Sequence, residues 1–219
     1  MRNNMQQHST TKQTSEWDQT DRHESINPSI LYYGTPVIIL STLNKDGSTN
    51  LSPLSSSWAL GDCLVLGVGT QGKAYENLCR HPECVINLPD ASMWRNVEAL
   101  GRTTGSSPVP EAKRQMGYAF CQDKFTAAGL TSQHSVRVAP DKIAECPLQI
   151  EAVVQHMRLP EHTPFMAIVE VKKVKVHAHT RLISEINRID PEQWHPLIYN
   201  FRHYYGLGER QGENFRAEK

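Results

Sequence analysis

A glycine-rich turn followed by a lysine carries the clearest chemistry in this sequence. Residues 67–72 are Gly-Val-Gly-Thr-Gln-Gly, and Lys73 follows them directly. Backbone N–H groups at the start of a helix attract anions, and glycines let a ligand approach the backbone closely. Lys73 would add a full positive charge at the same place. The turn therefore predicts a phosphate site, and a loop whose glycines only permit a tight bend is the alternative.

The same turn matches the G-x-G-x-x-G fingerprint of dinucleotide-binding folds, and Asp90 follows at the end of a later strand. Three features argue against that fold. The helix after the turn is stopped early by His81-Pro82, and a hairpin precedes the motif. The rest of the chain supplies no further strand–helix–strand units. We therefore expect a phosphate site outside a dinucleotide-binding fold.

Two other groups of residues could suggest catalysis or metal binding. Residues 55–57 are consecutive serines, but no G-x-S-x-G motif surrounds them and no base can be assigned to them. His177 and His179 share one face of an expected strand, without a cysteine or carboxylate at ligand spacing. We therefore expect neither a hydrolase nor a metal site.

Composition and charge exclude several classes of function. The 219 residues carry equal numbers of basic and acidic side chains, so no basic surface for nucleic acid or for an anionic membrane is expected. No apolar stretch approaches the roughly 20 residues that span a bilayer, and the polar start lacks a secretory signal. The five cysteines are an odd number without a Cys-x-x-Cys pair, which favours a reducing compartment. These features predict a soluble, cytoplasmic protein.

Short β-strands must position the glycine-rich turn. Apolar, β-branched runs predict buried strands, the first of them buried on both faces, and Asn-Lys-Asp-Gly at 44–47 predicts a hairpin turn. The expected strands are 37–40, 48–58, 63–68, 84–88, 148–155 and 165–177, and the expected helices are 73–80, 93–100, 111–116 and 191–201. Hairpin-linked strands with few helices indicate an antiparallel barrel.

The valines of the last long predicted strand do not all lie on one face of it. Val169 and Val171 have one parity, whereas Val174 and Val176 have the other. A one-residue shift at Lys172-Lys173 would reconcile the two halves, so a β-bulge is expected there.

The expected C-terminal helix carries Trp194, Leu197, Ile198 and Phe201 at three- and four-residue spacing, which makes one apolar face. Such a face has no obvious internal surface to cover it, so a twofold mate is expected to bury it. The aromatic segment 203–208 is a candidate cap for the partner's ligand site, with plain packing as the alternative.

Several segments between residues 32 and 177 carry a family resemblance: 33–43, 46–55, 72–78, 84–89, 123–131 and 145–151. In this order and spacing they resemble the flavin reductase-like, FMN-binding split-barrel family, particularly its flavoredoxin-type branch. The resemblance implies a mainly β fold, a six-stranded antiparallel split β-barrel of Greek-key character, working as a homodimer. With the helices expected above, the barrel would have short peripheral helices and a C-terminal helical arm.

The resemblance also implies which residues hold the flavin. The matching strand would place Asn50, Ser52, Pro53, Leu54, Ser55 and Ser56 beside the isoalloxazine ring and the ribityl chain. The matching helix start would place Thr70, Gln71, Gly72, Lys73 and Asn77 near the phosphate. Hydroxyls, backbone amides, an apolar wall and a cation are the groups that such a cofactor needs.

The chain departs from the family pattern at three places. Ala74 stands where threonine is frequent, Thr35 where arginine is common, and Ser56-Ser57 where larger side chains are frequent. These departures leave the choice between FMN and FAD open.

The resemblance implies an NAD(P)H:flavin oxidoreductase that passes hydride from nicotinamide to flavin N5 and supplies an oxygenase or another electron acceptor. That step needs no acid or base from the protein. Two alternatives stay open. One is a flavoredoxin-like FMN electron carrier acting with a protein partner, and the other is a barrel that binds another phosphorylated or planar ligand without redox use. The sequence does not choose between NADH and NADPH.

The expected domain organisation has three parts. Residues 1–27 are polar, with Trp17 as their only aromatic, and are expected to form a flexible tail. A lid or a dimer-wrapping arm anchored by Trp17 is the alternative. The FMN-binding barrel is expected at 28–180, and the C-terminal helical arm at 181–219.

Overall fold

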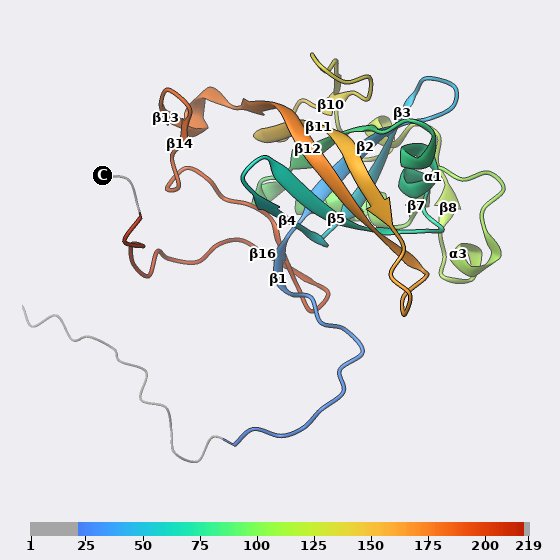
Figure 1. The fold of residues 1–219 in the computed structure, drawn as a ribbon, viewed down its shortest axis with the longest axis horizontal. Coiled ribbons are helices and arrows are strands. Elements are labelled where there is room, and N and C mark those ends of the chain that lie inside the picture. The colour runs from blue at the N-terminus through green and yellow to red at the C-terminus, as the bar shows by residue number, and fades with distance from the viewer. Residues whose placement is uncertain (1–21, 217–219) are drawn as a thin grey trace, which may run out of the picture. The chain divides into compact units, whose positions relative to one another are not determined.

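The computed structural model describes residues 22–216, which form mainly β-strands with short helices (Figure 1). The longer strands are β2 (Ile38–Leu43), β3 (Thr49–Leu54), β4 (Ser57–Leu60), β5 (Cys63–Gly69), β6 (Glu83–Leu88), β11 (Leu148–Arg158) and β12 (Met166–Ala178). The shorter strands are β1 (Tyr33–Pro36), β7 (Thr103–Thr104), β8 (Ala119–Phe120), β9 (Ser132–Gln133), β10 (Lys142–Ile143), β13 (Ile183–Glu185), β14 (Arg188–Ile189), β15 (Ile198–Asn200) and β16 (His203–Tyr205). The helices are α1 (Lys73–Arg80), η1 (Ala91–Met93), α2 (Trp94–Gly101), α3 (Glu111–Gln115), α4 (Lys124–Ala127) and η2 (Thr180–Leu182).

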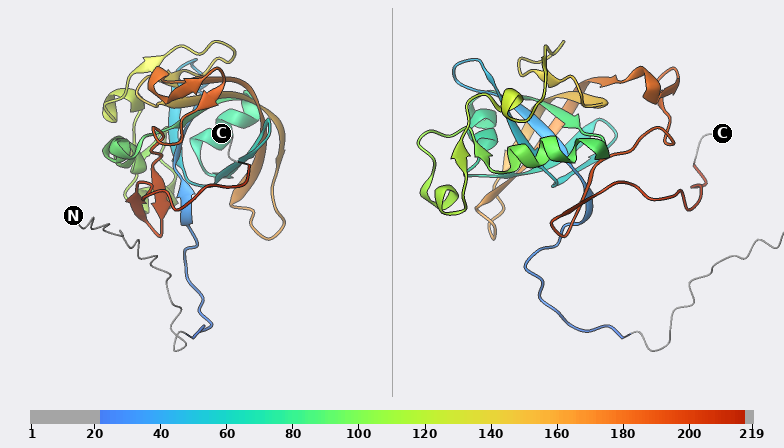
Figure 2. Two further views of the ribbon diagram at one scale, coloured as in Figure 1. Left: turned by 90° about the vertical axis from the view of Figure 1, so that its left-hand side faces the viewer. Right: turned by 180° about the vertical axis from the view of Figure 1, so that it is seen from behind.

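The main sheet of the described residues is antiparallel throughout, in the order β3-β2-β6-β11-β12-β5-β4. Its two edge strands, β3 and β4, are consecutive in the chain and separated only by Ser55 and Ser56. The sheet therefore curls until both edges belong to one chain segment, as Figure 2 shows. If residues 49–60 are counted as one bent strand, the sheet has the six strands that were predicted. The antiparallel pairing confirms the split barrel and excludes the dinucleotide-binding fold.

The predicted bulge in β12 is present, one residue later than expected. Glu151 faces Lys175 and Ala152 faces Lys173, which leaves Val174 without a partner across the strand pair. The extra residue moves the following valine to the other face of the sheet.

The core lies on both sides of β2, as its uninterrupted apolar run predicts. Ile38 and Leu40 point into the curled sheet, where Leu78 of α1 closes one end. The alternate residues Val37 and Ile39 belong to a second cluster, formed with α2 and the C-terminal segment. This second cluster holds α2 against the outside of β3 and so fixes one wall of the site described below.

The predicted helix at 191–201 is wrong. Residues 198–200 are β15, which pairs with β1 and, through a turn at Phe201 and Arg202, with β16. Both turn residues have positive φ, 44° and 69°, as a tight hairpin requires. Leu197 is buried in the second core cluster, and its backbone N–H donates to the Pro89 carbonyl. The helical spacing of the apolar residues therefore does not decide the structure here, and Pro196, which has no N–H to donate, opposes a helix.

The domain boundaries remain predictions. Residues 22–31 contain no helix or strand, and the rest of the predicted tail, with Trp17, lies outside the described residues. The described part of 181–219 contains the end of η2, short strands and turns, and no longer helix. No helix in the described residues is long and apolar enough to cross a membrane.

Candidate functional site

A pocket of about 380 Å³ lies where β3, the end of β5 and the start of α1 meet the segment 100–124. From β3, β5 and α1 it is lined by Ser52, Pro53, Leu54, Val68, Gly69, Gln71, Gly72, Lys73 and Ala74. From later segments it is lined by Leu100, Gly101, Thr103, Thr104, Gly105, Lys113, Tyr118, Lys124 and Phe165. We call this space the main pocket.

The start of α1 lines the main pocket with backbone N–H groups that have no partner among residues 22–216. Gly72 is the N-cap residue, with an extended backbone and no side chain that could cap the helix. A β-carbon at Gly72 would lie 2.9 Å from the Gly69 carbonyl oxygen, so the tight turn requires glycine there. Lys73, whose side chain is mostly buried, pairs with Glu76 at 2.7 Å. The predicted glycine-rich turn is therefore formed and lines a pocket, whereas anion binding at it remains a prediction.

Three lysines line the main pocket, and no carboxylate of the described residues does so. Lys124 is almost fully buried, and its Nζ donates to the Leu51 carbonyl at 2.7 Å. Burial lowers the pKa of Lys124 to about 8, and burial also lowers the pKa of Lys113. Both side chains pay a desolvation cost that a bound anion would relieve, so the pocket favours a phosphorylated ligand.

Asn50 and Gly105 form a close contact beside this cation cluster. Asn50 is 2% exposed, and its amide group donates to Ser52 at 3.1 Å. Its Oδ1 atom is buried and has no hydrogen-bond partner in the described residues. A β-carbon at Gly105 would lie 2.6 Å from that oxygen and 3.0 Å from Lys73 Cγ. A buried acceptor without a partner indicates a position where a ligand hydroxyl would bind.

A second hollow of about 370 Å³ shares part of its lining with the main pocket, and four tyrosines are among its lining residues. The two spaces share Pro53, Leu54, Gly69 and Tyr118. The second hollow adds Tyr32, Val37, Ser55, Ser56, Gly67, Val97, Tyr199 and Tyr204. We call it the tyrosine hollow, and it is suited to a flat ring.

The tyrosines of this hollow are held by one another and by Glu98. The Tyr199 ring lies 5.3 Å from that of Tyr32 and 5.7 Å from that of Tyr204. The Tyr204 hydroxyl donates to the Glu98 carboxylate at 3.1 Å. Burial and the Glu98 charge raise the pKa of Tyr204, so its phenol stays protonated. Segment 203–208 therefore packs beside a hollow of its own subunit, and its predicted role at a partner's site is untested.

Most of the predicted flavin-contacting residues lie in or beside these spaces. Ser52, Pro53, Leu54, Gln71, Gly72 and Lys73 line the main pocket, and Ser55 and Ser56 line the tyrosine hollow. Thr70 lies outside both, with its hydroxyl donating to the Pro164 carbonyl at 3.2 Å. Asn77 is fully buried on the inner face of α1, where its amide donates to Thr42 and Asn44. Their flavin contacts remain predictions.

Sequence reasoning missed the wall formed by segment 100–124. Thr103, Gly105, Lys113 and Lys124 reach the main pocket through loops and short helices that show no periodicity. The one available signal was the small, polar run Thr-Thr-Gly-Ser-Ser at 103–107, which permits close approach of the backbone. In residues 22–216, no group of three His, Cys, Asp or Glu side chains could hold a metal ion.

Comparisons with known proteins agree with this architecture. A model of the flavin reductase like domain matches residues 30–208. The uncharacterized protein YdfE of Bacillus subtilis (strain 168) is 52% identical over 199 residues, which cover 91% of this chain and 96% of that protein. The structure of flavoredoxin of Desulfovibrio vulgaris (Miyazaki F) has a TM-score of 0.73 at 20% identity, covering 90% of this chain and 100% of that chain. Nitrilotriacetate monooxygenase component B from Bacillus cereus has a TM-score of 0.68 at 19% identity, covering 89% and 100%.

Proposed function

The chain belongs to the flavin reductase-like domain family, and from this premise we propose that it is a flavin-binding oxidoreductase that takes hydride from NADH or NADPH. The observation that carries the proposal is the main pocket, which joins an uncapped helix start and three lysines to an apolar wall. A flavin nucleotide has the matching parts: a phosphate, a hydroxylated chain and a flat ring. Flavin supplies the redox chemistry, because its N5 accepts hydride.

The residues of the main pocket divide the binding among them. The start of α1 and Lys73 would bind the phosphate, with Lys113 and Lys124 adding positive charge. Asn50 does not line the main pocket itself, but its Oδ1 lies against Gly105, which does, and would accept a hydrogen bond from a hydroxyl of the ribityl chain. Pro53 and Leu54, which line both spaces, would contact the isoalloxazine ring.

The tyrosine hollow would hold the nicotinamide ring beside the flavin. It shares its wall at Pro53 and Leu54 with the main pocket, so two flat rings bound in the two spaces would be neighbours. Tyr199 and Tyr204 would exclude water and orient the ring, which is the protein's contribution to hydride transfer. The step needs no proton from the protein, and the protonated phenol of Tyr204 is held by Glu98.

The absorption spectrum of the purified protein with added FMN or FAD tests the proposal. We expect bound flavin to show its usual visible bands and to bleach rapidly when NADH or NADPH is added without oxygen. Bound flavin that stays oxidised with both nucleotides would instead support an electron carrier reduced by a protein partner. Failure of either flavin to bind would overturn the flavin assignment.

Flavin affinity is expected to fall as the pH rises through about 8. Lys124 is protonated below that value, and a bound phosphate stabilises its charged form, so binding is tightest there and weakens once the amine is neutral. Lys124→Met should bind FMN more weakly than the wild type at pH 7 and should lose the inflection near pH 8. Titrations across this range check the prediction, with Lys113→Met as the comparison. An unchanged inflection in Lys124→Met would contradict it.

We further propose that the protein works as a homodimer. The argument from a C-terminal helix no longer applies, but β4 leaves Trp58 56% and Leu60 77% exposed. Trp58 lines, together with Val65 and Ile168, a mainly apolar hollow of about 640 Å³. An apolar surface of this kind is typical of protein interfaces. A dimer by light scattering at micromolar concentration is expected, and a monomer would contradict the proposal.

The electron acceptor and the compartment complete the proposal. We propose that electrons pass to a separate protein, an oxygenase component, since a fold relative is named as component B of a monooxygenase. We place the protein in the cytoplasm, because its five cysteines are free, Cys63 and Cys79 being exposed.

A further inference from the structure

The loop between β11 and β12, residues 159–165, projects beyond the main sheet, as Figure 1 shows. We call it the projecting loop. The pairing of the two strands ends with Arg158 opposite Ile168, so residues 159–165 lie outside the strand ladder. Pro160 and Pro164 stand near the two ends of the loop, and proline fixes the backbone angle φ. The projecting loop is therefore a short segment with restricted ends that stands out from the sheet.

The glycine-rich turn holds the projecting loop through Thr70. The Thr70 N–H donates to the Phe165 carbonyl at 3.0 Å, and the Thr70 hydroxyl donates to the Pro164 carbonyl at 3.2 Å. Among residues 22–216, these are the only hydrogen bonds that join the loop to a part of the chain other than its own strands. Thr70, which was predicted to contact a phosphate, therefore fixes the loop to the turn that begins the candidate site.

The projecting loop brings an exposed aromatic ring to the main pocket. Phe165 lines this pocket and is 67% exposed. Tyr118 is the other aromatic residue of the lining, and Lys113 Nζ lies 5.8 Å from the centre of its ring. Phe165 has no such ring or cation contact among the described residues. An exposed aromatic ring gains from stacking on a flat apolar group, so Phe165 is suited to cover a ring bound in the main pocket.

We propose that the projecting loop forms a lid over the main pocket, with the Phe165 ring against the isoalloxazine ring of a bound flavin. The Thr70 hydroxyl holds this lid through its bond to the Pro164 carbonyl. The proposal rests on the proposed function for the identity of the ligand. A phenyl ring offers no hydrogen bond to a phosphate, so Phe165 acts on the flat part of the ligand, which FMN and riboflavin share. A lid of this kind keeps water from the ring and slows its release.

Fluorescence titrations and stopped-flow dissociation with FMN and with riboflavin, which has no phosphate, test the role of Phe165. Phe165→Ala should weaken both ligands by the same factor, about tenfold or more, as expected for the loss of one stacking contact. The loss should appear mainly as faster dissociation. Phe165→Tyr keeps the ring and should bind both ligands as the wild type does. Leu159→Ala, at a 51% exposed position of the same loop outside the pocket lining, is the matched control.

Thr70 is tested with the same two ligands. Thr70→Val keeps the shape and the backbone N–H but removes the hydroxyl, so it should weaken FMN and riboflavin alike by a few-fold. Thr70→Ser keeps the hydroxyl and should restore both affinities. A loss of affinity for FMN alone would show that Thr70 contacts the phosphate, and it would overturn the role of Thr70 in holding the lid.

The outcomes separate the lid from the proposed function. If the wild type binds both ligands and Phe165→Ala binds them equally well, or loses affinity for FMN alone, the lid is wrong while the flavin site stands. If the wild type binds neither ligand, the proposed function fails and the lid fails with it. Equal losses for FMN and riboflavin in Phe165→Ala, with wild-type binding in Phe165→Tyr and Leu159→Ala, would support the lid. Circular dichroism checks that each variant is folded.

Discussion

Gly105→Val is expected to weaken flavin binding by about a hundredfold or more while leaving the protein folded. A β-carbon at this position would lie 2.6 Å from Asn50 Oδ1 and 3.0 Å from Lys73 Cγ, so both side chains would have to move. Displacing Lys73 costs a charge-assisted hydrogen bond to phosphate, and displacing Asn50 costs a hydroxyl contact. Together these amount to about 3 kcal/mol, and each 1.4 kcal/mol is about tenfold in affinity.

Fluorescence titration with FMN measures the effect, and circular dichroism checks the fold. Gly208→Val is the matched control, because a β-carbon there meets nothing within 4 Å. It should bind FMN as the wild type does. Gly105→Ala should fall between the two, since one methyl group displaces the neighbouring side chains less than three carbons do. Wild-type affinity in Gly105→Val would show that segment 103–107 does not face the flavin.

Local sequence signals predicted the two elements of the candidate site that contiguous motifs form, α1 and the strand before Ser55. The bounds of α1 were predicted correctly, because glycine precedes it and Pro82 follows it. The strand before Ser55 could be predicted because its residues follow a hairpin turn directly. Segment 100–124 could not be predicted, because Lys124 reaches the pocket only where α2 and α4 pack against β3, a contact between segments far apart in the sequence.

The C-terminal segment shows a limit of periodicity. Trp194, Leu197, Ile198 and Phe201 have helical spacing, yet the structure uses Leu197 in the core and 198–200 as a strand. The unpaired backbone groups of β1 decide between the two, since pairing with β15 satisfies them. That partner lies far away in the sequence and leaves no local signal. Tyr199 and Tyr204 reach the tyrosine hollow only because of this pairing.

Glu151→Ala is expected to lower the free energy of unfolding by about 3–5 kcal/mol, because it breaks a buried charged cluster. Glu151 on β11 is fully buried. Its carboxylate accepts from the N–H groups of Val136 and Arg137 at 2.9 and 2.5 Å and pairs with His177 Nε2 at 2.6 Å. Lys142 Nζ lies 4.0 Å away. Alanine would leave these donors without their shared acceptor and release the loop between β9 and β10.

The protonation of the Glu151 carboxylate should make the free energy of unfolding depend on pH. Burial alone would raise the pKa of Glu151, but the Val136 and Arg137 N–H groups and His177 more than offset it, so the pKa lies below its usual value. Because the pKa of Glu151 is lower in the folded protein, its stabilising effect is complete at a pH above the pKa of Glu in the unfolded chain, about 4.3. The effect is lost as the pH falls through the pKa that Glu151 has in the folded protein. Glu151→Gln should therefore show a smaller loss of stability at pH 7 than alanine and a flatter decline in acid.

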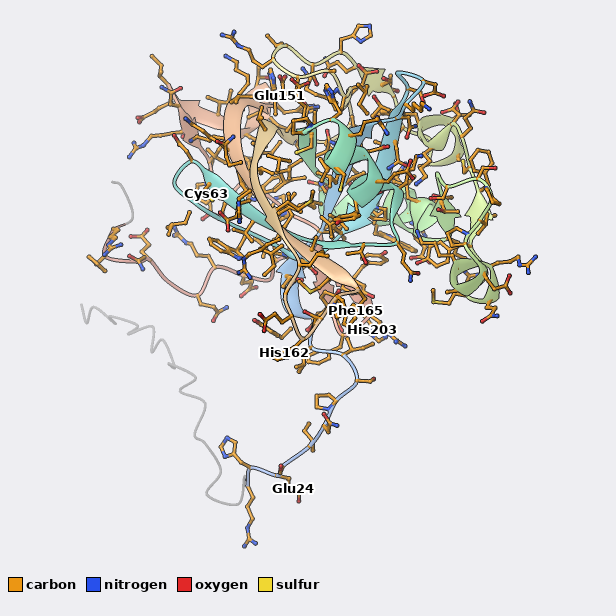
Figure 3. All side chains as sticks on the ribbon, turned by 45° about the vertical axis from the view of Figure 1, so that its right-hand side comes forward. Glu24, Cys63, Glu151, His162, Phe165 and His203 are labelled. Atoms are coloured by element: carbon orange, nitrogen blue, oxygen red, sulfur yellow. The ribbon has the colours of Figure 1, made fainter. Side chains whose placement is uncertain are left out.

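Urea unfolding at neutral and acidic pH measures both effects. Glu161→Ala, at an exposed position of the loop between β11 and β12, is the control and should stay within about 0.5 kcal/mol of the wild type. Figure 3 shows Glu151 far from Phe165, which lines the main pocket, so the folded Glu151→Ala protein should bind FMN with wild-type affinity. Unchanged stability would mean that the cluster makes no net contribution. Lost flavin affinity with intact stability would mean that β11 couples this end of the sheet to the site.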